Sequence, residues 1–240
     1  MTISYPRFQA DDALVRVTPA QVVPGLALPS AIVAEKRKSG AYRRFFKRAL
    51  DVGAILLAAP IVVPVVAVLA VAVSRDGGRA FYTQQRVGQQ GRAFRMWKLR
   101  SMVSDADARM ADYLAANPAA RAEWDSTQKL KNDPRVTAFG RFLRRTSLDE
   151  LPQLWNVLIG DMSLVGPRPM MLNQQALYPG TAYYALRPGI TGLWQTAGRN
   201  RTTFESRADF DAAYEAQVSL AADMKILFRT VGVVMNATGC

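Results

Sequence analysis

The sequence contains no histidine, and its single cysteine, Cys240, is the last residue. Without histidine the chain has no Ser-His-Asp or Cys-His nucleophile pair and no histidine-ligated zinc site. With one cysteine it forms no internal disulfide and no Cys-x-x-Cys site, which fits a reducing compartment. Any catalysis must therefore use carboxylates, lysines, arginines, hydroxyl groups or a metal ion that prefers oxygen ligands.

Negative charge is scarce: 19 Asp and Glu stand against 31 Lys and Arg, a net charge of +12. This balance predicts an anionic partner, which could be nucleic acid, an acidic membrane surface or a phosphorylated substrate. The first 30 residues do not show the pattern of a secretory signal peptide. We expect residues 1–38 to form a loosely ordered tail, because Pro19, Pro24 and Pro29 interrupt any helix there.

Charge is absent altogether from residues 52–73, a run of 22 positions that is long enough to span a bilayer. A buried core helix is the alternative, although it would normally show a polar face. Pro60 and Pro64 should bend the segment. Both flanks are basic, which places them on the same, cytoplasmic side. We therefore expect residues 39–75 to form a basic juxtamembrane helix and a re-entrant membrane helix, with Asp51 paired to Lys47 or Arg48 near its start.

Residues 76–240 show the pattern of a helix-rich α/β domain with a small β-hairpin. Ser104 is expected to cap a helix whose first turn carries two aspartates. A helix near the C-terminus is apolar with spaced charges, which suits either a membrane interface or the protein core. The expected elements are a turn at Asp76, strands 81–87 and 93–99 joined by loop 88–91, a helical stretch 109–131 interrupted at 117–118, and helices 136–145 and 220–235.

The stretch from Arg144 to Pro169 holds the best candidates for chemistry. Ser147 and Glu150 have the spacing of a capping box, in which Glu150 would only satisfy a backbone N–H at a helix start. The functional interpretation is that Asp149 and Glu150 lie among cations and serve phosphoryl transfer. A carboxylate can attack phosphorus and form an acyl phosphate. A second carboxylate can hold Mg²⁺. The candidate cations are Lys98, Arg100, Arg144 and Arg168.

Several blocks in order make the sequence recognisable. They are Lys47-Arg48-x-x-Asp51, QQRVGQQGRAFRMWKLRSM (84–102), TSLDELPQLWNVLIGDMSLVGPRP (146–169), RPGITGLWQTAGRN (187–200) and DMKILFRTV (223–231). Over about residues 43–238 the chain resembles the bacterial sugar transferase family of polyprenyl-phosphate glycosyl-1-phosphotransferases, of the small monotopic kind. The resemblance implies a membrane-associated enzyme of the bacterial inner membrane whose catalytic domain faces the cytoplasm, with a re-entrant helix and interfacial amphipathic helices.

By that resemblance, Asp149 takes a sugar-1-phosphate from a UDP-sugar, UMP leaves, and undecaprenyl phosphate then attacks the aspartyl intermediate. Glu150 is implied as the Mg²⁺ ligand. Lys98, Arg144 and Arg168 match phosphate-binding cations, and Asp161 matches an acidic position near the site. Arg187 and Arg199 could contact the nucleotide or the lipid phosphate, or could form loop salt bridges.

The membrane segment departs from the family pattern. Family members break their re-entrant helix at a Ser-Pro pair, whereas this chain has Ala59-Pro60 and a further proline at Pro64. The kink is kept, but the hydroxyl that could satisfy a freed carbonyl is missing.

Two other functions compete with this interpretation. A membrane-anchored basic protein that binds nucleic acid or acidic lipid without catalysis would share the charge and the apolar segment. It would not explain the carboxylates among cations, and the aromatic platforms of nucleic-acid binders are missing, so we expect no nucleic-acid partner. A non-catalytic scaffold would not need the complete set of candidate residues.

The sequence does not identify the sugar, but likeness to short exopolysaccharide-type members suggests galactose or glucose. The oligomeric state stays open, with a homodimer as one possibility.

Overall fold

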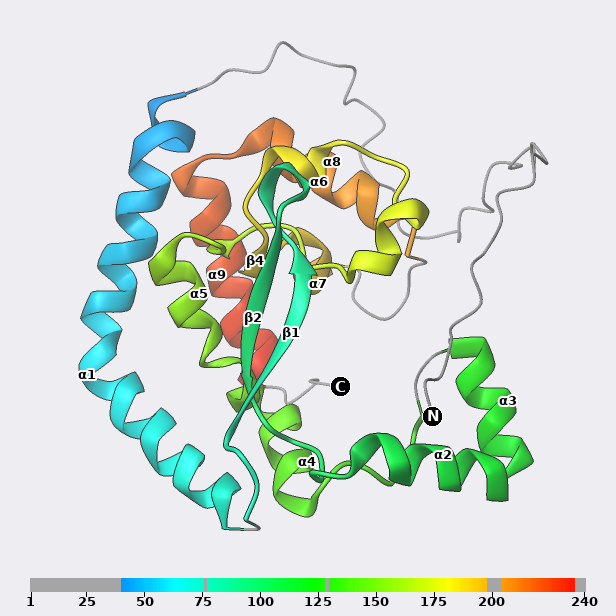
Figure 1. Cartoon of the computed structure of the whole chain (residues 1–240). Coiled ribbons are helices and arrows are strands. Elements are labelled where there is room, and N and C mark those ends of the chain that lie inside the picture. Colours follow the sequence, from blue (N-terminus) through cyan, green and yellow to red (C-terminus); the bar gives the residue numbers. More distant parts are fainter. Residues whose placement is uncertain (1–39, 76, 128–129, 198–203, 236–240) are drawn as a thin grey trace, which may run out of the picture. The chain divides into compact units, whose positions relative to one another are not determined.

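The structure is a computed structural model that describes residues 40–75, 77–127, 130–197 and 204–235. The tail expected over residues 1–38, the turn expected at Asp76 and the candidate residue Arg199 lie outside the described residues. Within the described residues, short strands form two sheets of two strands each, and helices surround them (Figure 1). The helix-rich α/β fold with small sheets that the sequence predicts is confirmed.

The elements of the described residues have the following bounds. The α-helices are α1 (Lys47–Ser74), α2 (Ala106–Ala116), α3 (Pro118–Thr127), α4 (Ala138–Arg145), α5 (Gln153–Ile159), α6 (Ala182–Ala185), α7 (Leu193–Ala197), α8 (Arg207–Gln217) and α9 (Leu220–Met235). The strands are β1 (Phe81–Val87), β2 (Ala93–Leu99), β3 (Ser163–Val165) and β4 (Gly189–Thr191). A π-helical turn η1 (Tyr42–Phe46) precedes α1, and the 3-10 turns are η2 (Gln89–Gly91), η3 (Leu148–Glu150) and η4 (Leu172–Leu177).

The helix α1 is long, apolar and largely exposed. With η1 it makes one helical stretch of 33 residues that, by length and composition, could cross a membrane. Only 6% of its most apolar window is buried, and Leu57 is 84% exposed. Pro60 and Pro64 both lie inside the helix, where each removes a backbone hydrogen bond. A core helix would bury such side chains, so the alternative of a buried core helix is wrong.

The first turns of α1 are fixed to the rest of the fold by polar contacts. Asp51 forms no direct ion pair with Lys47 or Arg48, because each of these groups has a partner distant in sequence, although the charge of Lys47 still acts on Asp51. Lys47 Nζ lies 2.6 Å from Asp223 Oδ2 on α9. The Arg48 guanidinium donates to carbonyls in the last turn of α5, and Asp51 Oδ1 accepts from the backbone N–H of Leu164, 3.1 Å away.

The last turn of α1 is fixed to the same folded unit. Val73 is buried and packs with Leu99 of β2 and Leu143 of α4. The Val73 carbonyl accepts a hydrogen bond of 3.1 Å from Arg100. Both ends of α1 therefore contact one folded unit, while its middle runs beside that unit (Figure 1).

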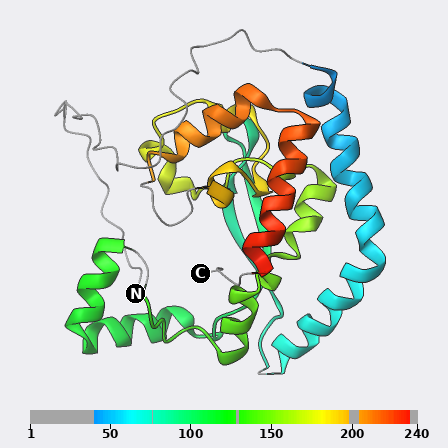
Figure 2. The same ribbon diagram turned by 180° about the vertical axis from the view of Figure 1, so that it is seen from behind.

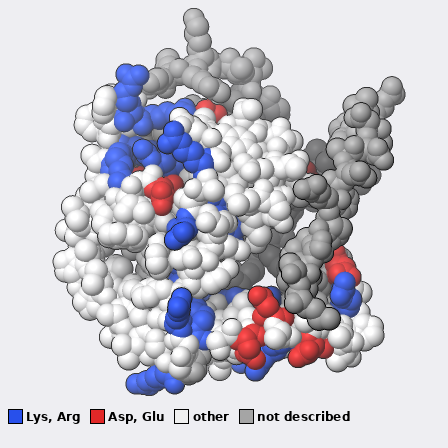
Figure 3. Space-filling view, viewed as in Figure 1, with Lys and Arg blue, Asp and Glu red and all other residues white. Residues whose placement is uncertain are grey.

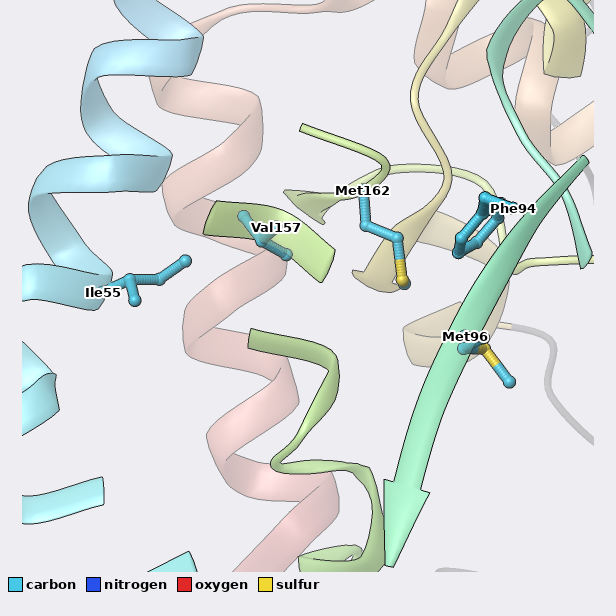
Figure 4. Packing of buried hydrophobic residues seen from close by; sticks show 5 residues of the cluster. All are labelled: Ile55, Phe94, Met96, Val157 and Met162. Carbon is cyan, nitrogen blue, oxygen red and sulfur yellow. The ribbon is translucent and has the colours of Figure 1, made fainter. Parts of the chain in front are cut away.

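Strands β1 and β2 form an antiparallel hairpin, and β2 contributes side chains to the hydrophobic core. Phe94 and Met96 of β2 are buried with Ile55 of α1 and with Val157 and Met162 (Figure 4). Successive side chains of a strand point to opposite faces, so residue 98 lies on the same face as residues 94 and 96. The register Phe81 with Leu99 and Val87 with Ala93 matches the predicted strands residue for residue.

The helix α9 presents two different faces. Ile226 is buried against Val165 and Tyr214, so part of the helix belongs to the core. Phe228 is 72% exposed and Val231 is 57% exposed. In both ribbon views α5 lies between α9 and α1 (Figure 2). One face of this helix thus belongs to the core and the other is exposed, and contact of the exposed face with a membrane interface stays a prediction.

The predicted break in the polar helical stretch is confirmed, since α2 ends before Asn117 and α3 begins at Pro118. The predicted cap at Ser104 is wrong: Asp105 is the N-cap residue, and its side chain makes no capping hydrogen bond. On the face shown in Figure 3, acidic side chains gather over α2 and α3.

Candidate active site

Asp149 and Glu150 lie together in the turn η3, directly before α5. Lys98 reaches this turn from the end of β2: its Nζ is 2.8 Å from Glu150 Oε1 and 3.6 Å from Asp149 Oδ2. The side chain of Asp149 is only 10% exposed, and those of Lys98 and Glu150 are about one fifth exposed. The structure thus brings together the two carboxylates and the lysine that the sequence singled out.

The turn that carries these carboxylates is not the start of a regular capped helix. Ser147 adopts a left-handed backbone conformation (φ 57°, ψ 18°) and makes no side-chain capping hydrogen bond. The capping box is therefore absent, and the Glu150 carboxylate faces Lys98 instead. A left-handed conformation at a residue other than glycine is uncommon and recurs at functional sites.

A buried amide fixes β2 against α5 and so places Lys98. The Asn156 side chain is fully buried; its Nδ2 donates to the Arg95 carbonyl at 2.7 Å and its Oδ1 accepts from the Trp97 N–H at 3.0 Å. Because both polar ends of the amide are satisfied by β2, sliding of the strand along the helix would leave buried polar groups unpaired. Lys98 is thus held over η3.

The environment of Asp149 opposes ionisation in part. Burial raises the pKa of the Asp149 carboxyl, Lys98 and Arg144 lower it, and the adjacent Glu150 raises it, with a net increase. Such a balance of desolvation and nearby cations is common where a carboxylate takes part in chemistry.

Arg144 approaches Asp149 from α4. Its Nε donates to Ser101 Oγ at 2.8 Å, and its positive charge acts on Asp149. Gly140 allows this approach, because a Cβ at position 140 would lie 1.9 Å from the Ser101 carbonyl oxygen. At the start of α4, the Thr137 side chain accepts from the Gly140 N–H at 2.8 Å. The close contact between α4 and Ser101 therefore sets the position of Arg144.

Arg168 is the fourth predicted cation to consider. Together with Glu150 it lines a cavity of about 290 Å³. The structure therefore places three predicted residues around Asp149: the adjacent Glu150, Lys98 in contact, and Arg144 within electrostatic range. Arg168 lines the same cavity as Glu150.

Two further arginines near Arg168 were not predicted as site residues. Burial lowers the pKa of Arg207 to about 10, and the positive charges of Arg168 and Arg86 act in the same direction. Burial and then the charge of Arg168 also lower the pKa of Arg86. The Nε atoms of Arg86 and Arg207 are buried without a hydrogen-bond partner among the described residues. Three mutually repelling guanidinium groups in a partly buried place form a candidate anion site.

The position of Arg207 is set by aromatic rings. Its guanidinium carbon lies 4.2 Å from the ring centre of Trp194 and 4.7 Å from that of Phe204. Arg86 belongs to the block 84–102, which resembles the family, so its place in that block could have indicated it as a site residue. Arg207 lies outside every such block and gave no comparable signal.

Three predicted residues lie elsewhere. Arg100 donates to the carbonyls of Arg79, Met102 and Val73, so its guanidinium joins segments of the fold, and its contact with phosphate stays a prediction. Asp161 and Arg187 lie at the far end of α5 from Asp149.

At that far end Asp161 accepts from Asn156 Nδ2 at 3.2 Å, and Arg187 donates to the Gly160 carbonyl at 3.1 Å. Because α5 has seven residues, about 10 Å of helix separates this end from η3. Both side chains contact the backbone or side chains of the fold there rather than the Asp149 turn.

The carboxylates fit a Mg²⁺ ion, judged by the chemistry of their oxygens. The described residues contain no group of three or more acidic side chains that could hold a metal ion by itself. Mg²⁺ is, however, commonly held by one or two carboxylates together with water and substrate phosphates. Glu150 and Asp149 supply two such carboxylates beside the cavity.

Comparison with known proteins places this arrangement in a family. Residues 42–237 match the family described as bacterial sugar transferase. The chain is 48% identical to the UDP-galactose-lipid carrier transferase of Erwinia amylovora over 198 residues, which is 82% of this chain and 42% of that protein. It is 42% identical to the exopolysaccharide production protein ExoY of Sinorhizobium fredii, over 80% of this chain and 87% of that protein.

A third relative carries a more detailed name. The UDP-glucose:undecaprenyl-phosphate glucose-1-phosphate transferase of Escherichia coli is 38% identical over 199 residues, 78% of this chain and 39% of that protein. The chain thus matches less than half of the longer relatives and most of the short one. Since the family match covers nearly all described residues, including the Asp149 turn, the chain belongs to the bacterial sugar transferase family.

Proposed function

We propose that this chain transfers a hexose-1-phosphate from a UDP-sugar to undecaprenyl phosphate, releases UMP, and so begins exopolysaccharide synthesis. Relatives named for UDP-galactose, for UDP-glucose with undecaprenyl phosphate and for exopolysaccharide production support the substrates. Galactose and glucose are therefore the first sugars to test.

The buried carboxylate of Asp149 carries the proposal. It lies in contact with Lys98, within electrostatic range of Arg144, and beside a cavity that Arg168 and Glu150 line. A carboxylate that served only to pair with a surface cation would not need a raised pKa and a left-handed residue two positions before it. Both features suit a nucleophile that is partly desolvated.

The chemistry needs two displacements at one phosphorus atom. In the first, a carboxylate oxygen of Asp149 bonds to the phosphorus that carries the sugar, the phosphoanhydride bond breaks, and UMP leaves with the electron pair. In the second, a phosphate oxygen of undecaprenyl phosphate bonds to the same phosphorus and the bond to Asp149 breaks. Neither step requires a proton to be taken from the nucleophile, which suits a chain without histidine.

Cations on both sides of Asp149 offset the charge of the transferring phosphate. Lys98 and Arg144 also favour the ionised, reactive form of Asp149. Arg168, with Arg86 and Arg207 beside it, suits the remaining phosphate of the donor. Glu150, with Asp149, would hold Mg²⁺, which when bound would neutralise phosphate charge and orient the donor.

The contacts of α1 support a re-entrant membrane helix. From Asp51 to Val73 a straight helix would cover about 33 Å, close to the thickness of a bilayer core. Asp51 and Val73 nevertheless both contact the unit that carries Asp149. A helix that crossed the membrane would draw this polar unit into it. We therefore propose that α1 enters the cytoplasmic leaflet, bends at Pro60 and Pro64, and returns.

Trapping of the intermediate tests the nucleophile. With a UDP-sugar labelled in the sugar phosphate, the wild-type chain without acceptor should become labelled at Asp149, as read by mass spectrometry. Asp149→Asn should abolish labelling and UMP release, and Glu150→Gln should lose most activity and its dependence on Mg²⁺. Asp125→Asn, which removes an exposed carboxylate on α3, is the control and should be labelled normally. Product formation by Asp149→Asn would contradict the assignment.

Cysteine labelling tests the topology. In a Cys240→Ser background, single cysteines at Gly40 and at Ser74 mark the two sides of α1, and both positions are exposed. A membrane-impermeant thiol reagent should reach both from the cytoplasmic side only. Labelling of position 74 from the opposite side would contradict the re-entrant helix while leaving the proposed reaction in place.

A further inference from the structure

The cavity beside Glu150 and Arg168 has mostly apolar walls. Its volume of about 290 Å³ lies near the lower end of the range for small-molecule pockets. The apolar side chains that line it come from η3 and the residue after it, from α5, from β4 and from α9: Leu148, Leu151, Leu154, Ile190 and Val233. A small ligand group that is flat or branched and mostly apolar would fit a cavity with such walls.

Most polar side chains of the cavity are satisfied within the fold. The hydroxyls of Thr191 and Thr230 form a hydrogen bond of 2.6 Å with each other. The Thr196 hydroxyl donates to the Gly192 carbonyl at 3.1 Å. These groups therefore do not require a ligand.

Gln195 is different. It lines the same cavity from α7, is only 8% exposed, and both its Oε1 and its Nε2 are buried without a hydrogen-bond partner among the described residues. Buried polar groups are nearly always paired, and an unpaired amide costs stability at both its donor and its acceptor. An amide left unpaired in the wall of a cavity beside a candidate active site indicates that a ligand completes it.

The chemistry of the amide limits the ligand. Gln195 can donate from Nε2 and accept at Oε1 side by side, so its complement presents an acceptor next to a donor. The edge of uracil has this arrangement, an N3–H flanked by carbonyl oxygens, on a flat and otherwise apolar ring. A hexose would leave most of its hydroxyls against apolar walls, and an isoprenoid chain would leave the amide unpaired.

We propose that this cavity binds the uracil base of the donor and that Gln195 recognises its N3–H and an adjacent carbonyl. The inference rests on the proposed function, since the base enters with the UDP-sugar. Glu150 and Arg168 line the same cavity, so a base bound there would leave its phosphates beside the Asp149 turn. Gln195 would thus determine specificity for the nucleotide without touching the reacting phosphorus.

Binding of UMP and of N3-methyl-UMP to the full-length chain tests the proposal without turnover. The methyl group replaces the N3–H and leaves the phosphate unchanged. Wild-type chain should bind UMP at least about tenfold more tightly than the methylated nucleotide, because a site built to pair a donor rejects the analogue that lacks it. Equal affinity of the wild-type chain for the two nucleotides would overturn the proposal, and this comparison requires no variant.

Gln195→Leu should bind both nucleotides with similar, weakened affinity and should keep the KM for undecaprenyl phosphate. Thr196→Val, a change in the same cavity wall at a satisfied hydroxyl, is the matched control and should keep the preference for UMP. A Gln195→Leu variant that keeps the wild-type preference, or in which only the KM for the lipid rises, would contradict base recognition. Absence of UMP release by the wild-type chain from any UDP-sugar would instead contradict the proposed function.

Discussion

Lys98 Nζ lies 3.6 Å from Asp149 Oδ2, and the side chain of Asp149 is 10% exposed. Burial raises the pKa of the Asp149 carboxyl while Lys98 lowers it, so the lysine favours the ionised form of a desolvated carboxylate. The two residues lie 51 positions apart and meet because Asn156 fixes β2 against α5. The reactivity proposed for Asp149 therefore depends on strand–helix packing as much as on its own turn.

Lys98→Met should lower UMP release by about a hundredfold or more, because it removes a cation that faces the transferring phosphate. It should also raise the pKa of Asp149 further. A carboxylate nucleophile is inactive when protonated, so the acidic limb of the pH–rate profile should move to higher pH. Initial rates of UMP release across the pH range measure both effects.

Arg121→Met, which breaks an exposed ion pair on α3, is the control for removal of a positive charge and should keep the wild-type profile. A Lys98→Met profile with a lower rate but an unmoved acidic limb would show that Lys98 does not act through the ionisation of Asp149.

Arg207→Met should weaken donor binding. Arg207 belongs with Arg86 and Arg168 to a group of cations whose charges repel each other, and an anion between them would relieve that repulsion. Loss of one charge-assisted contact to phosphate should raise the KM for the UDP-sugar by about tenfold or more. Steady-state kinetics with a varied donor concentration measure this change.

Arg135→Met is the matched control for Arg207→Met, because Arg135 also lies over a tryptophan ring, 5.3 Å from the centre of Trp124, but does not line the cavity. The control should leave the KM for the donor unchanged. An equal rise in both variants would mean that loss of an arginine–tryptophan contact, rather than of a phosphate contact, weakens binding.

Asp211 should make the free energy of unfolding depend on pH. Burial raises the pKa of the Asp211 carboxyl to about 7, although the Tyr178 hydroxyl and Arg207 act against it. The folded chain therefore binds this proton more tightly than the unfolded chain, whose aspartate has a pKa of about 3.9. Stability from this group is complete below about pH 4 and is lost as pH rises through about 7.

Asp211→Asn should flatten this pH dependence between about pH 4 and about pH 7, as followed by thermal unfolding. Asp209→Asn, an exposed position on the same helix, is the control and should keep the wild-type dependence. Parallel curves for wild type and Asp211→Asn would show that Asp211 is ionised in both states.

Local patterns predicted much of the fold. The strands 81–87 and 93–99 and the helix 220–235 have the predicted bounds, because alternation, a glycine-containing loop and an apolar periodicity are features of neighbouring residues. Asp149, Glu150, Lys98, Arg144 and Arg168 also meet as predicted around one turn. All of these residues except Arg144 lie in the sequence blocks that resemble the family, and Arg144 lies two residues before one of these blocks.

The features that the sequence did not predict depend on contacts between distant segments. The prediction of a capping box at Ser147 was wrong, because Ser147 takes a left-handed backbone conformation that the local sequence does not predict. The contact of Arg100 with the Val73 carbonyl at the end of α1 was not foreseen either, because it joins two segments 27 positions apart. Arg207 joins the site only because α8 packs on α7, where Trp194 holds it. Spacing along the chain contains none of this information.

Gly140→Ala tests whether close packing of α4 positions Arg144. The added Cβ would lie 1.9 Å from the backbone oxygen of Ser101, which cannot turn away as a side chain could. The helix must therefore shift, and Arg144 would lose its 2.8 Å hydrogen bond to Ser101 Oγ. We expect a loss of about 1–3 kcal/mol in the free energy of unfolding and a fall in the rate of UMP release.

Gly232→Ala on α9 is the matched control, because nothing lies within 4 Å of a Cβ at that position. Alanine favours a helix over glycine by about 1 kcal/mol, so this variant should be as stable as the wild type or more so. Thermal unfolding and UMP release should be measured on both variants, with Arg144→Met in parallel. If Gly140→Ala lost stability but kept the full rate, Arg144 would reach Asp149 without the contact between α4 and Ser101. The rate in Arg144→Met would then decide whether that cation acts in the reaction at all.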